Sequence, residues 1–297
     1  MTQSFFLYYF MKKVLYENGI TMIPKRRLGK TNVDVTILGL GGEGVLRTHG
    51  REREAYALIN RAIDLGLNYF DSAKAYVGCE SYHGKALGER RKDIFLAGKS
   101  HARDRKGALA HLTDTLKTIK TDHLDLWQMH DMRTEEDIEE VTARGGALEA
   151  FREAKEKGLV RFIGVTGHED PLIIRRCIEL ADFDTVLMPV NPAEPHYRSF
   201  IKDLLPHALQ KDMGIIAMKV YFRGMATQIP GVESVEPFYR FALSHPVTTA
   251  IIGCDTIAQL EENVRCARSF VPLKEREMVG LIDYVAPYAG DLMYYKP

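Results

Sequence analysis

The strongest constraint on the fold is an alternation that begins near residue 35, where short apolar runs of strand length are separated by longer amphipathic stretches. This order of strand, helix and strand predicts a parallel sheet. Eight such strands predict a closed α/β barrel of the (β/α)₈ or TIM-barrel type, with any active site at the carboxyl ends of the strands. The expected strands are 35–40, 67–71, 94–98, 124–129, 161–166, 185–190, 214–220 and 249–252.

The stretches between these runs have the period of helices. One apolar set with three- and four-residue spacing is Leu109, Leu112, Leu116 and Ile119. Such spacing indicates a helix with one buried face. Asp170 before Pro171 predicts a helix start, and Gly66 and Gly158 stand where helices are expected to end.

A glycine-rich segment, Gly39-Leu-Gly-Gly-Glu-Gly44, follows the first expected strand and matches G-x-G-x-x-G. In a dinucleotide-binding βαβ unit a helix must begin inside that motif. Here Gly50 interrupts the following stretch, and a helical pattern resumes only near Arg51. We therefore interpret the glycines as a turn at the barrel mouth that lets the backbone approach a ligand closely.

Composition argues against several classes of function. The 297 residues contain 40 Lys and Arg against 40 Asp and Glu, so a nucleic-acid partner is not expected. No apolar run approaches the roughly 18 residues of a membrane span. The four cysteines are far apart and form no C-x-x-C, which indicates neither a disulfide framework nor a metal site and favours a reduced, cytoplasmic protein. They are Cys79, Cys177, Cys254 and Cys266.

Residues 1–21 are interpreted as an N-terminal extension, for which disorder is compatible with the sequence. The apolar segment 4–11 has no basic region before it and no small-residue cleavage site after it, so a signal peptide is not expected. No linker or change of composition divides the remainder. We expect residues 22–297 to form a single barrel domain, and the sequence indicates no oligomeric state.

Four residues of reactive type lie at the ends of three successive expected strands. Asp71 and Tyr76 stand five positions apart in Asp71-Ser-Ala-Lys-Ala-Tyr76. Lys99 closes the next apolar run, and His130 closes the one after it. In a barrel of this type these positions meet at one mouth.

These residue types suit the reduction of a carbonyl group by hydride. Negative charge that develops on the carbonyl oxygen needs a proton donor, and Tyr76 is predicted to supply the proton. Because the usual pKa of tyrosine is about 10, we expect Lys99 to lower the pKa of Tyr76 and Asp71 to hold Lys99 in place. His130 is predicted to orient the carbonyl oxygen.

Each residue also has a purely structural interpretation. Asp71 and Lys99 would form an ion pair between adjacent strands, Tyr76 would be a loop aromatic, and His130 would be a buried histidine with satisfied hydrogen bonds. The occurrence of all four in this order at strand ends favours the catalytic interpretation. The other histidines His83, His101, His111 and His168 show no metal-ligand spacing and are expected at the surface or in packing.

Taken together, these residues resemble the aldo-keto reductase family, over roughly residues 22–270 of the chain. The resemblance rests on five segments, which are Asp71-Ser-Ala-x-x-Tyr76, Gly98-Lys99, Asp125-Leu-Trp-Gln-Met-His130, Gly158-Leu-Val-Arg-Phe-Ile-Gly-Val165 and Ile252-Gly-Cys-Asp-Thr-Ile-Ala-Gln-Leu-Glu-Glu-Asn263. The resemblance implies a (β/α)₈ nicotinamide-dependent enzyme. It also implies Tyr76 as the acid, tuned by Lys99 and Asp71, and His130 as the residue that positions the carbonyl.

The resemblance implies cofactor contacts after three strands, where this chain departs from the family pattern. The family often has Ser-Asn after the fifth strand, whereas here Thr166 substitutes in part and Gly167 does not. Asn191 stands near the place of a family glutamine. Lys219 follows the seventh strand, where it either contacts the cofactor pyrophosphate or is a solvated lysine at the rim.

The last strand is followed by a helix start that suits an anion. Thr256-Ile-Ala-Gln259 fits a capping box directly after Gly253, and a helix N-terminus attracts negative charge. In the resembling family this end receives the adenosine phosphate, and Glu262 and Asn263 match adenine-side positions. The family's usual cofactor makes NADP(H) the first choice, with NAD(H) open because Asp255 would repel a 2′-phosphate.

The predicted function is therefore reduction of an aldehyde or ketone, a small-molecule carbonyl substrate, by NADPH or NADH. An alternative is a cofactor-sensing regulatory subunit with the same barrel and slow turnover. A third is a lyase or isomerase in which Lys99 forms a Schiff base. The tyrosine-rich C-terminal tail is expected either to fold over the barrel mouth or to pack against the outer helices.

Overall fold

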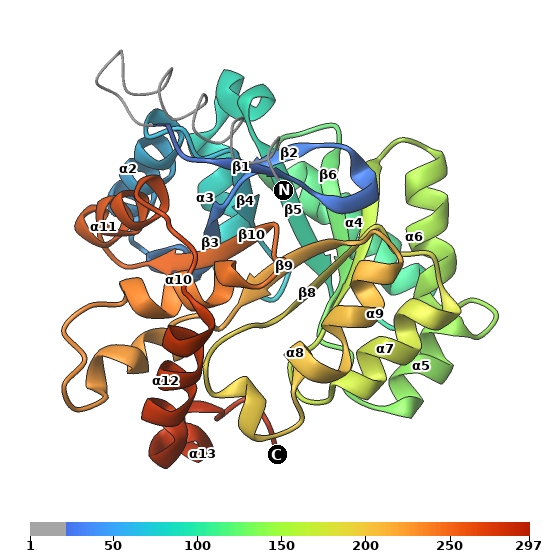
Figure 1. Cartoon of the computed structure of the whole chain (residues 1–297). Coiled ribbons are helices and arrows are strands. Elements are labelled where there is room, and N and C mark those ends of the chain that lie inside the picture. The colour runs from blue at the N-terminus through green and yellow to red at the C-terminus, as the bar shows by residue number, and fades with distance from the viewer. Residues whose placement is uncertain (1–21) are drawn as a thin grey trace, which may run out of the picture.

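The computed structural model describes residues 22–297, and its centre is a closed barrel of eight parallel strands (Figure 1). Each strand pairs with the next along the chain, and the last pairs with both the seventh and the first, which closes the barrel. The predicted (β/α)₈ fold is confirmed. The barrel strands are β3 (Leu38–Gly44), β4 (Tyr69–Asp71), β5 (Phe95–Ser100), β6 (Leu124–Met129), β7 (Val160–Thr166), β8 (Thr185–Pro189), β9 (Gly214–Met218) and β10 (Thr249–Cys254).

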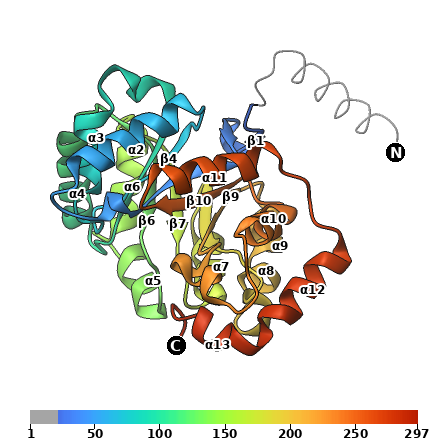
Figure 2. The ribbon, with the colours of Figure 1, turned by 90° about the vertical axis from the view of Figure 1, so that its left-hand side faces the viewer.

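One or two helices follow each barrel strand and cover its outer face (Figures 1 and 2). They are α2 (Glu52–Asp64), α3 (Cys79–Ala86), α4 (Arg105–Ile119), α5 (Glu135–Thr142), α6 (Ala147–Glu156), α7 (Pro171–Leu180), α8 (Phe200–Asp203), α9 (Leu205–Gln210), α10 (Glu236–Ser244) and α11 (Ile257–Arg268). Two further helices, α12 (Glu275–Val285) and α13 (Ala289–Leu292), lead to the C-terminus.

The first expected strand, 35–40, is divided in the structure. Its beginning belongs to β2 (Asp34–Thr36), which pairs antiparallel with β1 (Lys25–Arg27) in a hairpin outside the barrel. Figure 1 shows this hairpin at one end of the barrel and the C-terminus at the other. Leu28 and Val35 of the hairpin are fully buried in the cluster that fills the barrel. The hairpin therefore closes the end of the barrel opposite the strand C-termini, a long-range contact that local periodicity does not record.

The glycine-rich segment lies within strand β3, so its interpretation as a turn was wrong. An added Cβ at Gly39 would lie 2.8 Å from the Tyr69 ring. At Gly42 it would lie 2.8 Å from both the Asp71 carbonyl oxygen and the Tyr76 ring. The glycines thus serve close packing of β3 against β4 and the loop after it, where a side chain would force the strands apart.

Helix boundaries follow the expected local signals. Asp170 caps α7 by accepting a hydrogen bond from the backbone N–H of Leu172, with Pro171 in the first helical position. Thr256 caps α11 by accepting from the N–H of Gln259, whereas the Gln259 side chain accepts from Asp255 instead of completing a capping box.

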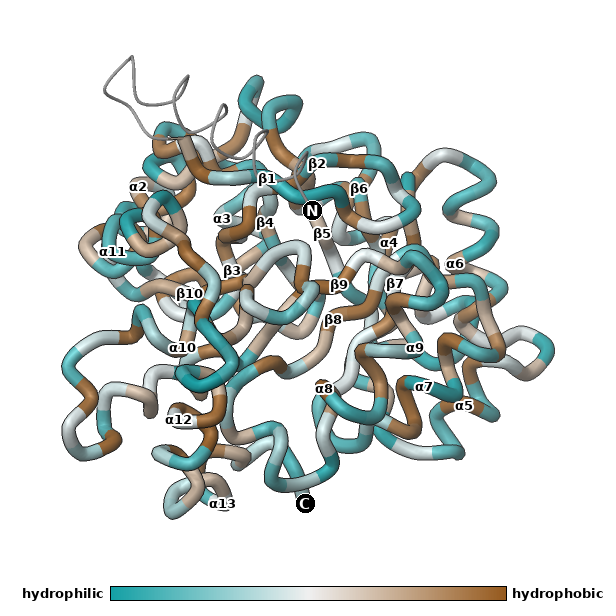
Figure 3. The backbone as a smooth tube through the Cα atoms, viewed as in Figure 1, coloured by the Kyte–Doolittle hydropathy of each residue, from teal (hydrophilic) through white to brown (hydrophobic). Residues whose placement is uncertain are grey.

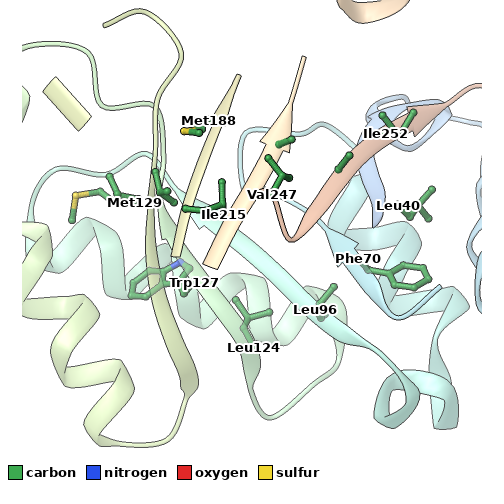
Figure 4. Packing of buried hydrophobic residues seen from close by; sticks show 14 of the residues in the cluster. Leu40, Phe70, Leu96, Leu124, Trp127, Met129, Met188, Ile215, Val247 and Ile252 are labelled. Atoms are coloured by element: carbon green, nitrogen blue, oxygen red, sulfur yellow. The ribbon is translucent and has the colours of Figure 1, made fainter. Parts of the chain in front are cut away.

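The main core lies between the barrel and its helices, and Figure 4 shows part of it. Trp127 on β6 stacks on Phe151 of α6, with ring centroids 3.8 Å apart. Hydropathy changes along the outer helices as their buried and exposed faces alternate (Figure 3). No helix within residues 22–297 is long and apolar enough to cross a membrane. The expected extension, 1–21, lies outside the described residues.

Two glycine-to-alanine changes should alter stability in opposite directions. In α3, a Cβ on Gly84 would lie 2.1 Å from the carbonyl oxygen of Thr118 in α4, so Gly84→Ala should lower the free energy of unfolding by about 1–3 kcal/mol through overpacking. In α12, Gly280 has nothing within 4 Å of an added Cβ, so Gly280→Ala should raise it by about 0.5–1 kcal/mol. Urea denaturation midpoints would measure both. A shift in the same direction for the two variants would contradict this account.

Candidate active site

The four residues that were predicted to be catalytic meet at the carboxyl ends of their strands. Asp71 is the last residue of β4, Lys99 lies near the end of β5, and His130 directly follows β6. Tyr76 lies in the loop between β4 and α3, and its ring centroid is 5.8 Å from that of His130 in an edge-to-face arrangement. The structure thus brings all four together.

Lys99 and Asp71 form a buried ion pair beneath Tyr76. The Lys99 Nζ atom lies 2.7 and 2.6 Å from the two carboxylate oxygens of Asp71 and donates a third hydrogen bond, of 2.9 Å, to the carbonyl of Ser72. Both side chains are only 1% exposed. The three N–H groups of the ammonium are therefore all used.

The loop that carries Tyr76 is held by backbone bonds to β5. Ser72 N–H donates to the carbonyl of Ala97, and Lys74 N–H donates to that of Lys99, so the chain follows β5 beyond the end of β4. A turn then closes from Tyr76 N–H to the carbonyl of Ala73. This path places the Tyr76 ring with its centroid 4.8 Å from the Lys99 ammonium.

Burial raises the pKa of the Tyr76 hydroxyl well above its usual value, and the carboxylates of Asp71 and Glu43 raise it further. Arg47 acts in the opposite direction. We expected Lys99 to lower this pKa, but the net shift is upward, because desolvation of the phenolate outweighs the nearby cations. Tyr76 therefore carries its proton at neutral pH.

His130 is held as a neutral imidazole. Burial lowers its pKa well below the usual value, and the charges of Lys99 and other neighbouring cations lower it further. The guanidinium of Arg103 bonds the carbonyls of His130 and Asp131, at 2.9 and 2.8 Å, and also the carboxylate of Asp137. This clamp fixes the backbone that carries the histidine.

Tyr76, Lys99 and His130 border a cavity of about 540 Å³ at the barrel mouth, and Asp71 lies behind Lys99. The lining of the cavity is mostly polar and charged. The lining residues are Glu43, Arg47, Ala75, Tyr76, Lys99, His130, Asp131, Arg133, Thr166, His168, Glu169, Leu187, Met218, Lys219, Arg223, Tyr294, Tyr295, Lys296 and Pro297.

The predicted cofactor residues after β7, β8 and β9 have different placements. Thr166 and Lys219 line the cavity. Asn191 is fully buried and does not line it. Its amide donates to the Lys219 carbonyl and the Tyr295 hydroxyl, and its oxygen accepts from two backbone N–H groups, so its hydrogen bonds hold the protein together.

The residues predicted around the last strand lie apart from this cavity. Gly253 in β10 is exposed, as are Thr256 and Gln259 at the start of α11, and Glu262 is partly exposed. Asn263 is buried, where it accepts a hydrogen bond from the Tyr221 hydroxyl and donates one to the Cys254 sulfur. The exposed helix N-terminus is open to an anion, whereas Asn263 is occupied by internal contacts.

The C-terminal tail folds over the barrel mouth, one of the two arrangements left open by the sequence. Lys296 Nζ lies 2.8 Å from Glu194, and both side chains are 1% exposed or less. The hydroxyl of Tyr295 donates to the same carboxylate at 2.8 Å. Lys219 donates to the Tyr294 hydroxyl at 3.2 Å. The tail thereby forms one wall of the cavity.

His168, which was expected at the surface or in packing, lines the cavity. Its Nδ1 atom lies 3.2 Å from Oδ1 of Asp131, although not along the direction of a hydrogen bond. Burial lowers the pKa of this imidazole to about 4, so it is neutral at pH 7. Its position two residues beyond the end of β7 was the available signal. Nothing in the sequence pairs it with Asp131, which has a left-handed backbone with φ of 58°.

Known proteins are similar to this chain in sequence and in fold. The model of the "Aldo/keto reductase family" matches residues 37–230. The oxidoreductase YqkF of Bacillus subtilis is 25% identical over 293 residues, which cover 82% of this chain and 91% of that protein. L-galactose dehydrogenase of Arabidopsis thaliana is 25% identical, with coverage of 82% and 88%.

The fold also matches a solved structure. The aldo-keto reductase AKR11C1 from Bacillus halodurans, in its holo form, superposes with a TM-score of 0.74 at 22% identity, covering 88% of this chain and 96% of that one. That likeness concerns the fold, while the family match spans more than half of the sequence. This chain therefore belongs to the aldo/keto reductase family and is an NAD(P)H-dependent oxidoreductase.

Proposed function

We propose that this protein reduces an aldehyde or ketone to an alcohol, with Tyr76 as the proton donor. The observation that carries the proposal is the arrangement at the barrel mouth. A protonated tyrosine, a neutral His130 and Lys99, which is held by the buried Asp71, border one cavity. The nicotinamide cofactor, when bound, supplies the hydride.

Tyr76 would transfer its hydroxyl proton to the carbonyl oxygen as negative charge develops there. The product is an alcohol, and the remaining phenolate lies close to two cations. Lys99 Nζ is 4.8 Å and Arg47 Cζ is 5.0 Å from the centroid of the Tyr76 ring. Both cations stabilise the phenolate more than the phenol, so they favour proton transfer.

His130 would donate a hydrogen bond to the same oxygen. A neutral imidazole has one N–H donor, and burial keeps His130 neutral. It therefore orients the carbonyl without competing with Tyr76 as the source of the proton.

The charges at the mouth suit a dinucleotide. Lys219 and Arg223, on the connection after β9, would hold its pyrophosphate, and the exposed start of α11 would receive the phosphate of the adenosine end. Asn191 and Asn263 are occupied by internal bonds and are not among the proposed direct contacts. We propose that the protein prefers NADPH over NADH as its cofactor.

Schiff-base chemistry at Lys99 is disfavoured by the geometry. A nucleophilic amine needs a free lone pair. The Lys99 ammonium instead donates to both oxygens of Asp71 and to Ser72. This arrangement serves a fixed cation, as reduction requires.

The polar lining of the cavity favours small polar carbonyl compounds as substrates. L-galactose dehydrogenase, by its name, acts on a sugar of this kind. We also propose a cytoplasmic location, because the four cysteines are all buried and free, as in proteins of reducing compartments.

Replacing Tyr76 by Phe should lower kcat/KM for aldehyde reduction at least about a hundredfold, since general acid catalysis contributes about 10²–10⁴. Cofactor binding, followed by fluorescence quenching, should change little. Tyr56→Phe is the matched control, because it removes a tyrosine hydroxyl from α2 outside the cavity. Activity of Tyr76→Phe within a few-fold of the parent would exclude Tyr76 as the acid. A parent protein that binds cofactor but turns over no carbonyl would support a regulatory role.

Replacing Lys99 by Met should impair both catalysis and folding. Reduction should fall about as much as in Tyr76→Phe. An unpaired Asp71 carboxylate in this buried site should cost roughly 3–5 kcal/mol of stability. The double variant Lys99→Met/Asp71→Asn separates the effects, because it removes the buried charge and should regain stability without activity. Urea denaturation midpoints measure stability, and kcat/KM measures catalysis. Recovered activity in the double variant would show that Lys99 acts only through folding.

Loss of Lys99 should also move the alkaline limb of the pH–rate profile to higher pH. The cation stabilises the phenolate, so its removal raises the pKa of Tyr76, and reduction requires the protonated form. An unchanged limb, with hydride transfer shown to be rate-limiting by a deuterium isotope effect, would mean that Lys99 does not tune the acid.

NADPH should bind more tightly than NADH when the two are titrated separately by fluorescence quenching. The start of α11 attracts an additional phosphate, whereas the exposed Asp255 opposes it. Asp255→Arg should increase the preference for NADPH, since arginine binds phosphate by charge-assisted hydrogen bonds. A lower dissociation constant for NADH in the parent protein would overturn the proposed cofactor.

A further inference from the structure

Three of the cavity's cations are matched by carboxylates. Lys99 is paired with Asp71, and Lys296 with Glu194. Arg133 contacts two carboxylates, one on Asp131 and one on Glu169. The charge on these side chains is therefore compensated within the protein.

Arg47 and Arg223 share a single carboxylate. Nη1 of Arg47 lies 2.8 Å from one oxygen of Glu43, and Nη2 of Arg223 lies 3.5 Å from the other. Lys219 has no carboxylate within 4 Å among residues 22–297. His130 and His168 are neutral. Glu43 is therefore the single carboxylate side chain within 4 Å of any of these three cations, Arg47, Arg223 and Lys219, among residues 22–297.

These three cations come from two connections at the mouth, and Arg47 and Arg223 both approach Glu43. Lys219 and Arg223 follow β9, where the pyrophosphate would bind. Arg47 ends the turn that follows β3, and its guanidinium carbon is 5.0 Å from the centre of the Tyr76 ring. Of the three, only Arg47 contacts the proposed acid, so it is placed to bind the carbonyl substrate.

The guanidinium of Arg47 has a free edge. Its one hydrogen bond, through Nη1, goes to Glu43. Nε and Nη2 have no partner within the described part of the chain, and the side chain is 39% exposed. These two nitrogens form the planar fork that binds two oxygens of a carboxylate or phosphate side by side. Arg133 uses the same two nitrogens to bind one carboxylate oxygen, Oδ2 of Asp131.

We propose that the substrate is a small carbonyl compound with an anionic oxygen group, a carboxylate or a phosphate, and that Arg47 binds this group. The inference rests on the proposed carbonyl reduction. Because Arg47 lies against the Tyr76 ring, the anionic group and the carbonyl are separated by only a few bonds. Glu43 holds Arg47 in place through Nη1 and leaves the fork open to the substrate.

Matched substrates test the proposal. The first pair is 4-oxobutanoate and its methyl ester. The kcat/KM of the parent protein should be at least about tenfold higher for the carboxylate than for the ester, mainly through a lower KM, since charge-assisted hydrogen bonds to a planar guanidinium are stronger than neutral ones. Glyceraldehyde 3-phosphate and glyceraldehyde provide the same comparison for phosphate. The pair with the larger ratio identifies the anion.

Arg47→Gln should reduce the larger of the two ratios of kcat/KM, anionic over neutral substrate, to within about twofold of unity. Arg47→Lys should restore part of this ratio. Arg53→Gln, which removes an exposed arginine of α2, should leave the ratio unchanged. Calorimetric titration of 4-oxobutanoate and of glyceraldehyde 3-phosphate into Tyr76→Phe protein saturated with oxidised cofactor provides a readout without turnover. Adding Arg47→Gln to that variant should weaken binding of the preferred anion at least about tenfold.

The outcomes separate this inference from the proposed function. Reduction of neutral and anionic aldehydes at equal kcat/KM would overturn the role of Arg47 and leave carbonyl reduction standing. Absence of reduction, together with Arg47-dependent binding of the anionic probe, would overturn carbonyl reduction but retain the anion site. Weaker cofactor binding in Arg47→Gln, with an unchanged ratio between acid and ester, would assign Arg47 to the cofactor and contradict the proposal.

Discussion

The site depends on one interaction, the buried ion pair between Lys99 and Asp71. Removing two charges from water is costly, and in this barrel the cost is offset by a two-oxygen contact and a further bond to the Ser72 carbonyl. Such a pair has strict geometric requirements, because either group alone would be an uncompensated charge in a water-poor site. It therefore fixes the relative positions of the ends of β4 and β5, and with them the loop that carries Tyr76.

Barrel geometry then determines what this pair can do. Asp71 pairs with Ala97 in the register of β4 and β5, and Lys99 pairs with Gln128 in the register of β5 and β6. The stagger between neighbouring strands lets the Lys99 side chain contact Asp71 on β4, while His130 follows β6 on the other side of β5. The glycines of β3 allow a close approach from the other side, so that Tyr76 is confined between packed backbone and fixed charge. Burial keeps the Tyr76 phenol protonated, and adjacent cations stabilise the phenolate that remains once the proton has left.

The barrel and the four residues at its mouth were predictable because both follow from local order. Apolar runs alternate with amphipathic stretches, and strand ends meet at one mouth in this fold. Other features depend on contacts between distant segments. The β1–β2 hairpin, Arg47 against Tyr76, and His168 near Asp131 arise only when the barrel closes. The internal bonds of Asn191 were not predictable for the same reason, since its partner Tyr295 lies 104 residues away.

The walls of the cavity are held by ion pairs other than the Lys99–Asp71 pair. The turn with Arg47 is tied to Glu43, the loop after β6 is clamped by Arg103 and Arg133, and the tail is locked by Lys296 on Glu194. None of these pairs includes Asp71 or Lys99. Substitutions in the loop after β6 or in the tail can consequently change which carbonyl compound fits without disturbing the proton donor, whereas Arg47 and Glu43 also act on the pKa of Tyr76. In such a barrel the catalytic residues lie at the strand ends, whereas the loops that contact the substrate are held by other ion pairs. The reaction can therefore be retained while the substrate changes.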